Sequence, residues 1–276
     1  MKKSTMHMTF EGANGTVTGS CTRLTYSCGG EQVQLLVDCG LRQESEEGDL
    51  RKPEWSFEPK SIHSVLLTHA HIDHAGALPL LYLAGFTGRV FATEATRDLC
   101  VAMLGDVAKS TGFYEKTDVE KIHWMLVDRI ESGRNPHGFI PVANGIRTCF
   151  LRSSHILGAS SVYVQWFHNV AEAGDDIPPA SDDDYANVGT VFFSGDIGRT
   201  FDGINPESTF LKPNMFPYKG RNNVFFITAY AGIYCAAEFI GHHFAGIDAV
   251  AALDAGADVF PVAPDCLGRH IGIRQH

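Results

Sequence analysis

Residues 64–77, SVLLTHAHIDHAGA, constrain more than any other stretch what this chain can fold into. The apolar run Ser64 to Leu67 predicts a short buried strand, and a loop rich in histidine follows it and enters a helix near Ala75 to Ala84. An ordinary turn does not require three histidines, whereas neutral imidazole and carboxylate are standard ligands of zinc. The stretch therefore predicts a metal site at the end of a strand.

The spacing inside this cluster predicts two metal positions. His69 and His71 lie two residues apart, so their side chains share one side of an extended chain and can aim at one point. Asp73 and His74 come one turn later, where the chain begins to coil, and they point to a second position. Two metals about 3.5 to 4 Å apart clamp both oxygens of a displaced group, which is the geometry of a hydrolytic site.

Two later residues are predicted to complete the ligand set. His155 lies in SSHILGAS, beyond a strand that ends near Leu151, and Asp196 lies in FFSGDIGR, beyond a strand that ends at Phe193. In layered α/β folds, sites assemble at such strand ends. Among these residues, Asp73, His74 and Asp196 are the predicted catalytic residues. The predicted metal ligands are His69, His71, Asp73, His74, His155 and Asp196.

Asp38, in LLVDCG, ends another apolar strand, where a buried carboxylate is costly unless it has a partner. Two interpretations stay open for it. Asp38 orients a ligand histidine through the second ring nitrogen of that histidine, or it accepts backbone N–H groups in a turn.

The rest of the chain reads as strands and helices in alternation. A hairpin-rich sheet is expected over the first 40 residues, a polar loop over Leu41 to Pro59, and a strand over Arg89 to Ala92. Thr93 is expected to cap a helix with the apolar stripe Leu99, Met103 and Val107, and the pattern Thr117 to Glu120 to open a second helix reaching about Glu131. Further strands are expected at Ile146–Leu151, Ser161–Phe167, Val188–Phe193, Val224–Ile227 and Asp258–Val262.

Two segments of the C-terminal half have other predicted structures. The acidic stretch Ala171 to Tyr185 is expected to form a surface loop. A helix that contains His242 and His243 is expected to run through Ala249 to Leu253, with both histidines on the surface.

Charge and cysteine content bound the function. The chain has 22 basic and 32 acidic side chains, a formal charge of -10, and no block of Lys or Arg, so a nucleic-acid role rests on the site alone. Its seven scattered cysteines form no CxxC pair and fit reduced thiols in the cytoplasm. No apolar run of about 20 residues and no secretory signal is present, which predicts a soluble, cytoplasmic protein without membrane contact.

The order of HxHxDH, a later histidine and an aspartate after a strand resembles the metallo-β-lactamase fold hydrolases, which are αββα sandwiches. EGANGTVTGSC, LLVDCGLRQ, SHILGAS and FSGDIGR narrow the resemblance to the β-CASP branch, which contains RNase J-like enzymes and the pre-mRNA 3'-end endonuclease. The resemblance implies two zinc ions and RNA as substrate. It implies that His69, His71 and His155 hold one zinc, that Asp73 and His74 hold the other, and that Asp196 bridges them.

Beyond Arg199 the resemblance weakens. The segment Val224 to Ala231 keeps Tyr230 but has Ile227 where the branch has an acid, and Leu253 to His270 resembles the start of the β-CASP insertion. We therefore expect a metallo-β-lactamase-like domain over residues 1–210, and over 211–276 the end of that half with the start of a β-CASP-like region truncated at its C-terminus. Such a chain has an incomplete second zinc site, and a partner chain or missing segment covers an exposed sheet edge.

Three functions remain open on the sequence. The first is a zinc-dependent RNA phosphodiesterase. The second is a small-molecule metallo-hydrolase of the same fold, such as a thioesterase or lactonase, which suits the acidic charge. The third is a metal-binding remnant without catalysis.

Overall fold

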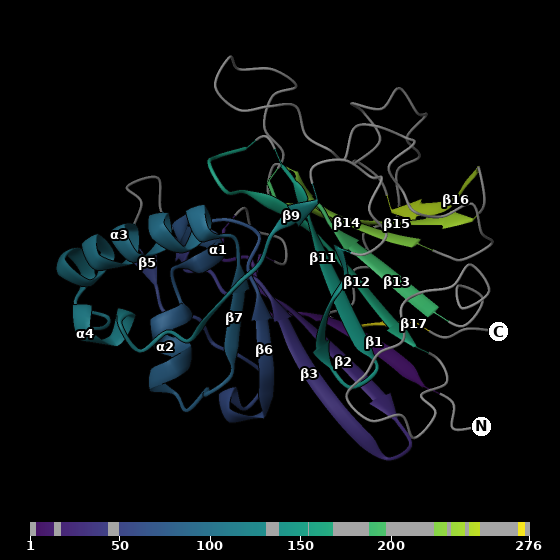
Figure 1. Cartoon of the computed structure of the whole chain (residues 1–276), viewed down its shortest axis with the longest axis horizontal. Helices are drawn as coiled ribbons and strands as arrows, with labels where there is room; N and C mark the ends of the chain where they lie inside the picture. The colour runs from purple at the N-terminus through teal and green to yellow at the C-terminus, as the bar shows by residue number, and fades with distance from the viewer. Residues whose placement is uncertain are drawn as a thin grey trace.

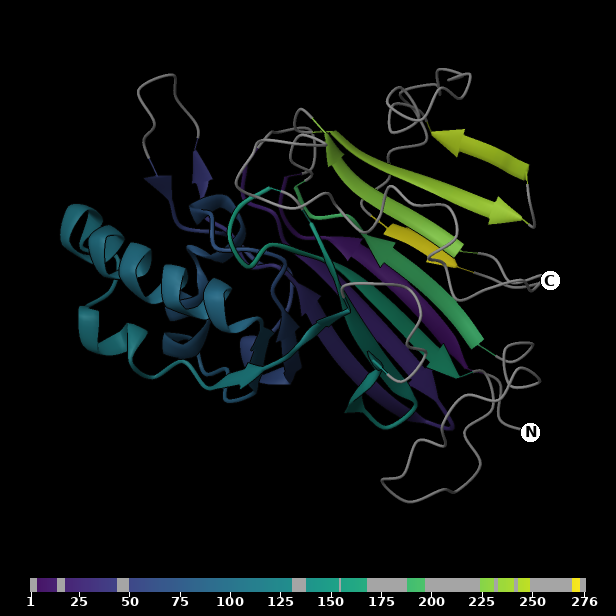
Figure 2. The same ribbon diagram turned by 45° about the horizontal axis from the view of Figure 1, so that its top comes forward.

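Two β-sheets lie face to face in the computed structural model, and the helices of the described residues cover the outer face of one of them (Figures 1 and 2). The structure describes residues 4–13, 18–43, 50–130, 138–153, 155–167 and 188–196, with strands at 224–230, 233–240, 243–248 and 270–273. This layering of helices, sheet and sheet matches the first half of the expected sandwich. The expected domain boundary between residues 210 and 211 lies outside the described residues.

The first sheet has seven strands in the order β17-β1-β2-β3-β6-β7-β8. The strands β17, β1, β2 and β3 pair antiparallel, whereas β3, β6, β7 and β8 pair parallel. Because parallel strands run the same way, the carboxyl ends of β3, β6 and β7 meet at one edge of the sheet. The bounds are β1 Thr5–Phe10, β2 Thr22–Cys28, β3 Glu31–Val37, β6 Ile62–Leu66, β7 Arg89–Ala92, β8 Trp124–Leu126 and β17 His270–Ile273.

The second sheet follows the order β10-β11-β12-β13-β14-β15-β16, with β9 paired to β11. Since β11 and β13 both pair antiparallel with β12, they run in the same direction and end at the same edge. The bounds are β9 Arg129–Ile130, β10 Ile140–Ala143, β11 Ile146–Arg152, β12 Ser160–Phe167, β13 Val188–Phe193, β14 Val224–Tyr230, β15 Ile233–Ile240 and β16 His243–Asp248.

Two apolar cores hold these layers together. The core between the sheets takes alternate residues of each strand, such as Leu35 and Val37 of β3 and Val162 and Val164 of β12, because successive strand side chains point to opposite faces. Burial of each such side chain stabilises the fold by about 1.5 to 3 kcal/mol.

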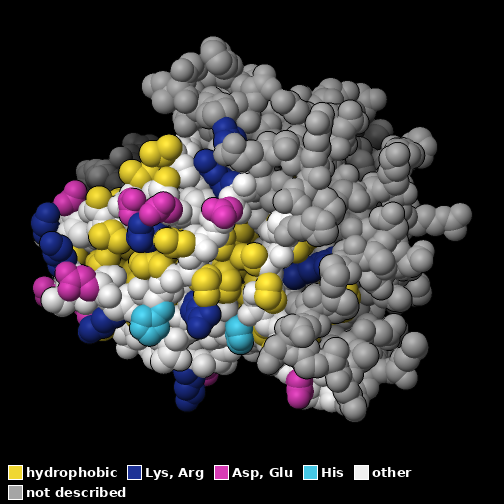
Figure 3. All heavy atoms as spheres, in the orientation of Figure 1, with side chains coloured by type: hydrophobic (Ala, Val, Ile, Leu, Met, Phe, Trp, Pro, Cys, Tyr) yellow, Lys and Arg dark blue, Asp and Glu magenta, His cyan; other side chains and the backbone are white. Residues whose placement is uncertain are grey.

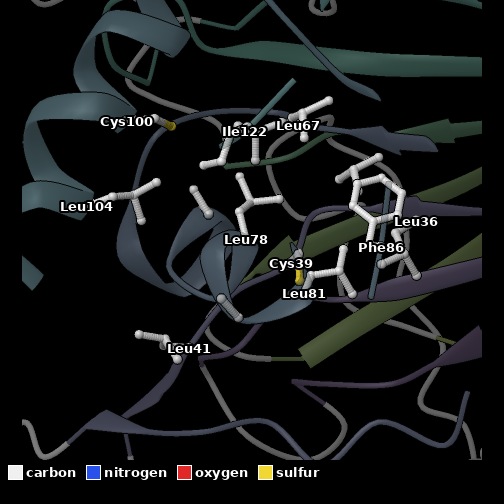
Figure 4. Close-up of a cluster of buried hydrophobic side chains, with 14 of the residues drawn as sticks. Leu36, Cys39, Leu41, Leu67, Leu78, Leu81, Phe86, Cys100, Leu104 and Ile122 are labelled. Carbon is white, nitrogen blue, oxygen red and sulfur yellow. The ribbon is translucent and has the colours of Figure 1, made fainter. Parts of the chain in front are cut away.

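The core between the first sheet and the helices is shown in Figure 4. This cluster includes Leu36 from the sheet and Leu78, Leu81 and Leu104 from the helices, and all four are fully buried. The helices are α1 Ile72–Ala75, α2 Leu78–Leu83, α3 Glu94–Thr111 and α4 Lys116–Val119, with a short 3-10 turn at Pro59–Ser61. No helix among the described residues is long and apolar enough to cross a membrane.

The expected strands over the first 200 residues are confirmed within a few residues at each end, and so is the Thr93 cap of α3, whose side chain accepts from Thr96 N. The expected apolar stripe of α3 is wrong in part. Leu99 is 38% exposed, whereas Cys100 and Leu104 are buried. Three consecutive apolar residues at positions 99–101 leave the helix rotation ambiguous in the sequence.

The second expected helix is also wrong. Helix α4 ends at Val119, and its capping box joins Glu115 to Asp118, whose Oδ2 accepts from Glu115 N at 2.8 Å, rather than starting at Thr117. The chain then forms β8, because the edge of β7 offers backbone partners, as in the 2.9 Å bond from Val90 N to His123 O. The expected loop after Leu41 also contains a small ribbon, β4 Arg42–Gln43 with β5 Leu50–Arg51.

The helix expected around His242 and His243 is contradicted, because Ile233–Ile240 and His243–Asp248 form strands. Strand β15 reads IYCAAEFI, whose β-branched and aromatic residues favour a sheet, and it pairs along its length with β14. His242, residues 249–253, the expected strand at 258–262 and the acidic segment 171–185 lie outside the described residues.

Candidate metal centre

Five strand ends bring the polar residues together. Asp38 follows β3, His69 follows β6, His155 follows β11 and Asp196 follows β13. The first two belong to one sheet and the last two to the other, so the site lies where the carboxyl edges of the two sheets meet. Thr93, the cap of α3, follows β7 at this edge.

Helix α1 carries the second part of the histidine cluster. His71 has an extended backbone and precedes the helix, so Asp73 and His74 fall within its single turn. The chain after β3 packs closely on that turn, and a Cβ atom at Gly40 would lie 1.7 Å from Asp73 O. Only glycine permits this approach, so Gly40 allows α1 to pack closely on the chain that follows β3.

Four donor atoms converge on one point. His71 Nδ1 lies 3.1 Å from His69 Nε2 and 3.0 Å from His155 Nε2. Asp196 Oδ2 lies 3.8 Å from His69 Nε2 and 3.4 Å from His155 Nε2. Metal bonds of roughly 2.0 to 2.1 Å in a tetrahedron place ligand atoms about 3.3 Å apart. The separations therefore fit a single divalent ion, and these four residues form a group that could hold a metal.

The other oxygen of Asp196 faces a second group. Asp196 Oδ1 lies 3.3 Å from His74 Nε2, and Asp73 Oδ2 lies 3.8 Å from the same nitrogen. One carboxylate thus presents one oxygen to each group, which is the arrangement a bridging ligand requires. The structure brings together all six residues that the sequence singled out as ligands.

Asp38 makes both kinds of contact that the sequence left open, one with a histidine ring nitrogen and one with a backbone N–H. Its Oδ2 lies 2.7 Å from His74 Nδ1, and its Oδ1 accepts from Thr68 N at 2.8 Å. Asp38 has a φ of 61°, a left-handed conformation that is uncommon outside glycine and turns the carboxylate toward both partners. Holding Nδ1 leaves Nε2 of His74 directed at Asp196 and Asp73.

Burial and neighbouring charges set the protonation of these groups. Burial, together with the neighbouring histidines, holds the pKa of His69 well below its usual value, and burial also lowers the pKa of His155. Burial opposes a charge on His74, but Asp38 and Asp196 outweigh it and raise the pKa of His74 to about 10. Burial raises the pKa of Asp196, yet His74 and the other histidines hold it below its usual value. His69 and His155 are therefore neutral beside an ionised Asp196, as metal ligands have to be, whereas a metal ion at His74 has to displace the proton of Nε2.

Sequence reasoning missed the hydroxyl groups that support the site. Thr68 Oγ1 lies within 3.0 Å of both oxygens of Asp38 and of His69 Nδ1. Ser153 Oγ donates to Asp196 O at 2.6 Å and so links the two loops from the second sheet. Serine and threonine are common at strand ends, so no pattern in the sequence marked these two.

The chain is similar in sequence to known proteins. Residues 18–131 match the metallo-beta-lactamase superfamily. Ribonuclease TTHA0252 of Thermus thermophilus is 44% identical over 112 residues, which are 40% of this chain and 25% of that protein. Transcription termination factor FttA of Methanosarcina mazei is 33% identical over 177 residues, 58% of this chain and 26% of that protein. Cleavage and polyadenylation specificity factor subunit 3-I of Arabidopsis thaliana is 32% identical over 161 residues, 55% of this chain and 22% of that protein.

The chain spans about a quarter of the length of these relatives. The family match over residues 18–131 includes the histidine cluster. The family match and the relatives together confirm the resemblance drawn from the sequence motifs. Residues 18–131 are therefore a metallo-β-lactamase superfamily domain, and the chain is a relative of the β-CASP, RNase J-like branch.

Proposed function

We propose that this chain hydrolyses RNA phosphodiester bonds with two zinc ions bound at the candidate metal centre. The observation that carries the proposal is the position of Asp196, with Oδ2 beside His69 and His155 and Oδ1 beside His74. A carboxylate whose two oxygens face different groups of ligands suits two metals a few ångströms apart.

The donors fit zinc better than the harder cations. Imidazole suits zinc and other late transition metals, whereas magnesium and calcium prefer oxygen ligands. We assign the first zinc to His69, His71 and His155 and the second to Asp73 and His74, with Asp196 between them. When bound, the metals would supply Lewis-acid activation of water and stabilise charge on the phosphoryl oxygens.

The protein residues hold the metals and their protons in place. Asp38 accepts from His74 Nδ1 and so reserves Nε2 for a metal. Thr68 donates its backbone N–H to the same carboxylate, which holds Asp38 in place against the buried ring of His74. We assign Asp73, His74 and Asp196 the catalytic role because they line the second position, where Asp73 and Asp196 remain partly exposed.

RNA as substrate is supported by the relatives, which are named a ribonuclease, a termination factor and a subunit of a cleavage factor. The surface gives weaker support. On the face drawn in Figure 3, the Lys and Arg side chains of the described residues are scattered among acidic and apolar ones and form no basic stripe there. We therefore propose that contacts at the metal centre, more than a charged surface, hold the phosphate. The described cysteines are free, in keeping with a cytoplasmic location.

The acidic charge of -10 favours one alternative, hydrolysis of a small ester or thioester by the same metals. Neutral and anionic small molecules need no basic surface. This alternative is therefore compatible with the acidic composition, which RNA binding does not explain.

The test combines metal content with substrate choice. Elemental analysis should find two zinc ions per chain, and cleavage of a labelled single-stranded RNA should fall at least a hundredfold in Asp73→Asn. The matched control is Asp106→Asn on α3, a carboxylate that is 78% exposed and pairs with Lys109; it should cleave as the wild type does. Hydrolysis of thioesters or lactones without RNA cleavage would replace this proposal with the alternative.

A further inference from the structure

The loop from Ser153 to Ala159 carries His155 between β11 and β12. Ser153 N donates to Ala159 O at 3.0 Å, and Ala159 N donates to Ile156 O at 3.0 Å. At the tip of the loop Leu157 is 62% exposed, whereas Ile156 is partly buried and packs against the core between the first sheet and the helices. What aligns His155 with the other histidines therefore has to come from the elements beneath the loop.

The first turn of α3 lies directly beneath it. Thr93 Oγ1 donates to Gly158 O at 2.9 Å, and the same oxygen accepts from Thr96 N at 3.2 Å as the helix cap. Gly158 has a φ of +83°, and a Cβ atom there would lie 2.5 Å from Thr96 N. The loop therefore touches the helix by backbone, at a point where only glycine fits.

Other contacts hold the same loop at its C-terminal end. Arg129 Nη1 donates to Ala159 O at 3.2 Å, and Ser160 N donates to Thr68 O at 2.9 Å. Thr68 precedes His69 in sequence. The loop of His155 is thus tied to the histidine cluster on one side and to α3 on the other.

The hydroxyl of Thr93 does more than a helix cap requires. A cap needs only an oxygen that accepts from the helix, and Thr93 provides it to Thr96 N. A hydroxyl has one hydrogen to donate, and both Thr96 Oγ1 and Gly158 O lie 2.9 Å from Thr93 Oγ1. Thr96 Oγ1 is a hydroxyl that can itself donate to Thr93, whereas the carbonyl oxygen of Gly158 only accepts, so all three groups are satisfied when Thr93 donates to Gly158 O. Thr93 is 6% exposed, so water does not readily replace that donor.

We propose that Thr93 and Gly158 are positioning residues, which seat the loop on the first turn of α3 and so place His155 in the metal centre. Neither residue touches the metal position. The inference rests on the proposed metal centre and adds the contact by which a helix of the first sheet orients a ligand from the second.

The test measures metal affinity and loop order in the full chain. Thr93→Val removes the hydroxyl, and Gly158→Ala adds the Cβ atom that meets Thr96 N. Each should weaken the tighter zinc site 10- to 100-fold, the usual cost of losing a group that supports a ligand. Zinc competition with a chelating dye gives the affinity, and the visible spectrum of bound Co²⁺ reports a changed ligand geometry.

Two control variants separate positioning from stability. Thr93→Ser keeps the hydroxyl and should restore zinc affinity to within about threefold of the wild type. Asp118→Ala removes the capping side chain of α4, which is remote in sequence from the loop, so it should lower stability without changing zinc affinity or the Co²⁺ spectrum.

Loop order is measured without metal. In the metal-free chain, the amide hydrogens of Ser153 and Ala159 should exchange at least tenfold faster in Thr93→Val than in Thr93→Ser. Folded Thr93→Val and Gly158→Ala chains with wild-type zinc affinity and unchanged amide exchange would overturn the inference. A wild-type chain that binds zinc but cleaves no RNA would refute the RNA function alone. If the wild type binds no zinc, the exchange rates decide whether Thr93 seats the loop.

Discussion

The two sheets contribute to the metal centre in different ways. The first sheet supplies residues from one short segment, in which His69 and His74 have side chains 1% and 4% exposed. The second supplies His155 and Asp196, which lie 41 positions apart (196 − 155) and have side chains 23% and 29% exposed. In the first half His69 and His74 are buried in the core and Asp73 is 27% exposed, whereas both residues of the second half are partly exposed.

This difference indicates which residues of the centre affect folding stability and which affect mainly metal binding. Asp38 and His74 form a buried ion pair that also holds Thr68 and the turn of α1. Asp196 is fixed mainly through its backbone, by Ser153. We therefore expect changes in the first half to cost folding stability and changes in the second to cost mainly metal affinity.

The largest expected effect is on Asp38. Replacing it by alanine leaves His74 buried without its partner, which typically costs about 3 to 5 kcal/mol in the free energy of unfolding. Asp196→Ala should cost about 1 kcal/mol or less, because its carboxylate is partly exposed. Urea unfolding with a chelator present measures both values. Equal losses in the two variants would show that the halves do not differ in this way.

Metal removal should have the next largest effect. A ligand that binds only the folded chain at 100 times its Kd stabilises it by about 2.7 kcal/mol. Zinc should therefore raise the midpoint of thermal unfolding, and a chelator should reverse the rise. In His155→Ala the rise should be much smaller, although the metal-free chain remains about as stable as the wild type. A full zinc-dependent rise in His155→Ala would mean that the loop-borne histidine is not a ligand.

A smaller effect is expected at Ser153, which links the two loops. Ser153→Ala removes the hydrogen bond from Oγ to Asp196 O, and a single such bond contributes about 0.5 to 1.5 kcal/mol. Zinc affinity should fall several-fold, whereas the contact between His74 and Asp38 should be unaffected. Zinc titration beside urea unfolding checks both parts. If Ser153→Ala lowered the free energy of unfolding as much as Asp38→Ala does, Ser153 would belong with the residues of the first half, whose loss costs folding stability.

The smallest effect concerns Asp118, which belongs to neither half. Its hydrogen bond with Lys121 and that with Glu115 N hold its pKa below the usual value. A carboxyl group with a lowered folded pKa adds stability above its unfolded pKa, and that stability is lost as the pH falls through the folded pKa. Asp118→Asn should therefore reduce the decline in stability below about pH 4. An acid decline identical to that of the wild type would assign the effect to other carboxyl groups.

The sequence predicted local features well where chemistry was dense. The strand before His69, the cap at Thr93 and the six candidate ligands could be found because their patterns are short and specific. The patterns failed where neighbours decide the outcome. Helix α4 ends at Val119 because the edge of β7 pairs with the chain that follows, and residues 233–240 form a strand because β14 offers a partner.

The site shows the same division. Spacing alone assigned His69 and His71 to one point, and it placed Asp73 and His74 one turn further along. The sequence could not choose between two tasks for Asp38, since a carboxylate after a strand can serve either. The fold made both tasks compatible by holding Asp38 at a φ of 61°, between Thr68 and His74.

By itself, the sequence determined the kind of chemistry, because imidazole and carboxylate groups at this spacing suit a metal wherever they are placed. Only the tertiary structure decided that His155 and Asp196 meet the cluster, since nothing local joins residues so far apart in the chain. The physical reason is the direction of the strands. Parallel β3 and β6 and co-directional β11 and β13 end at shared edges, and the packing of the two sheets sets those edges against each other.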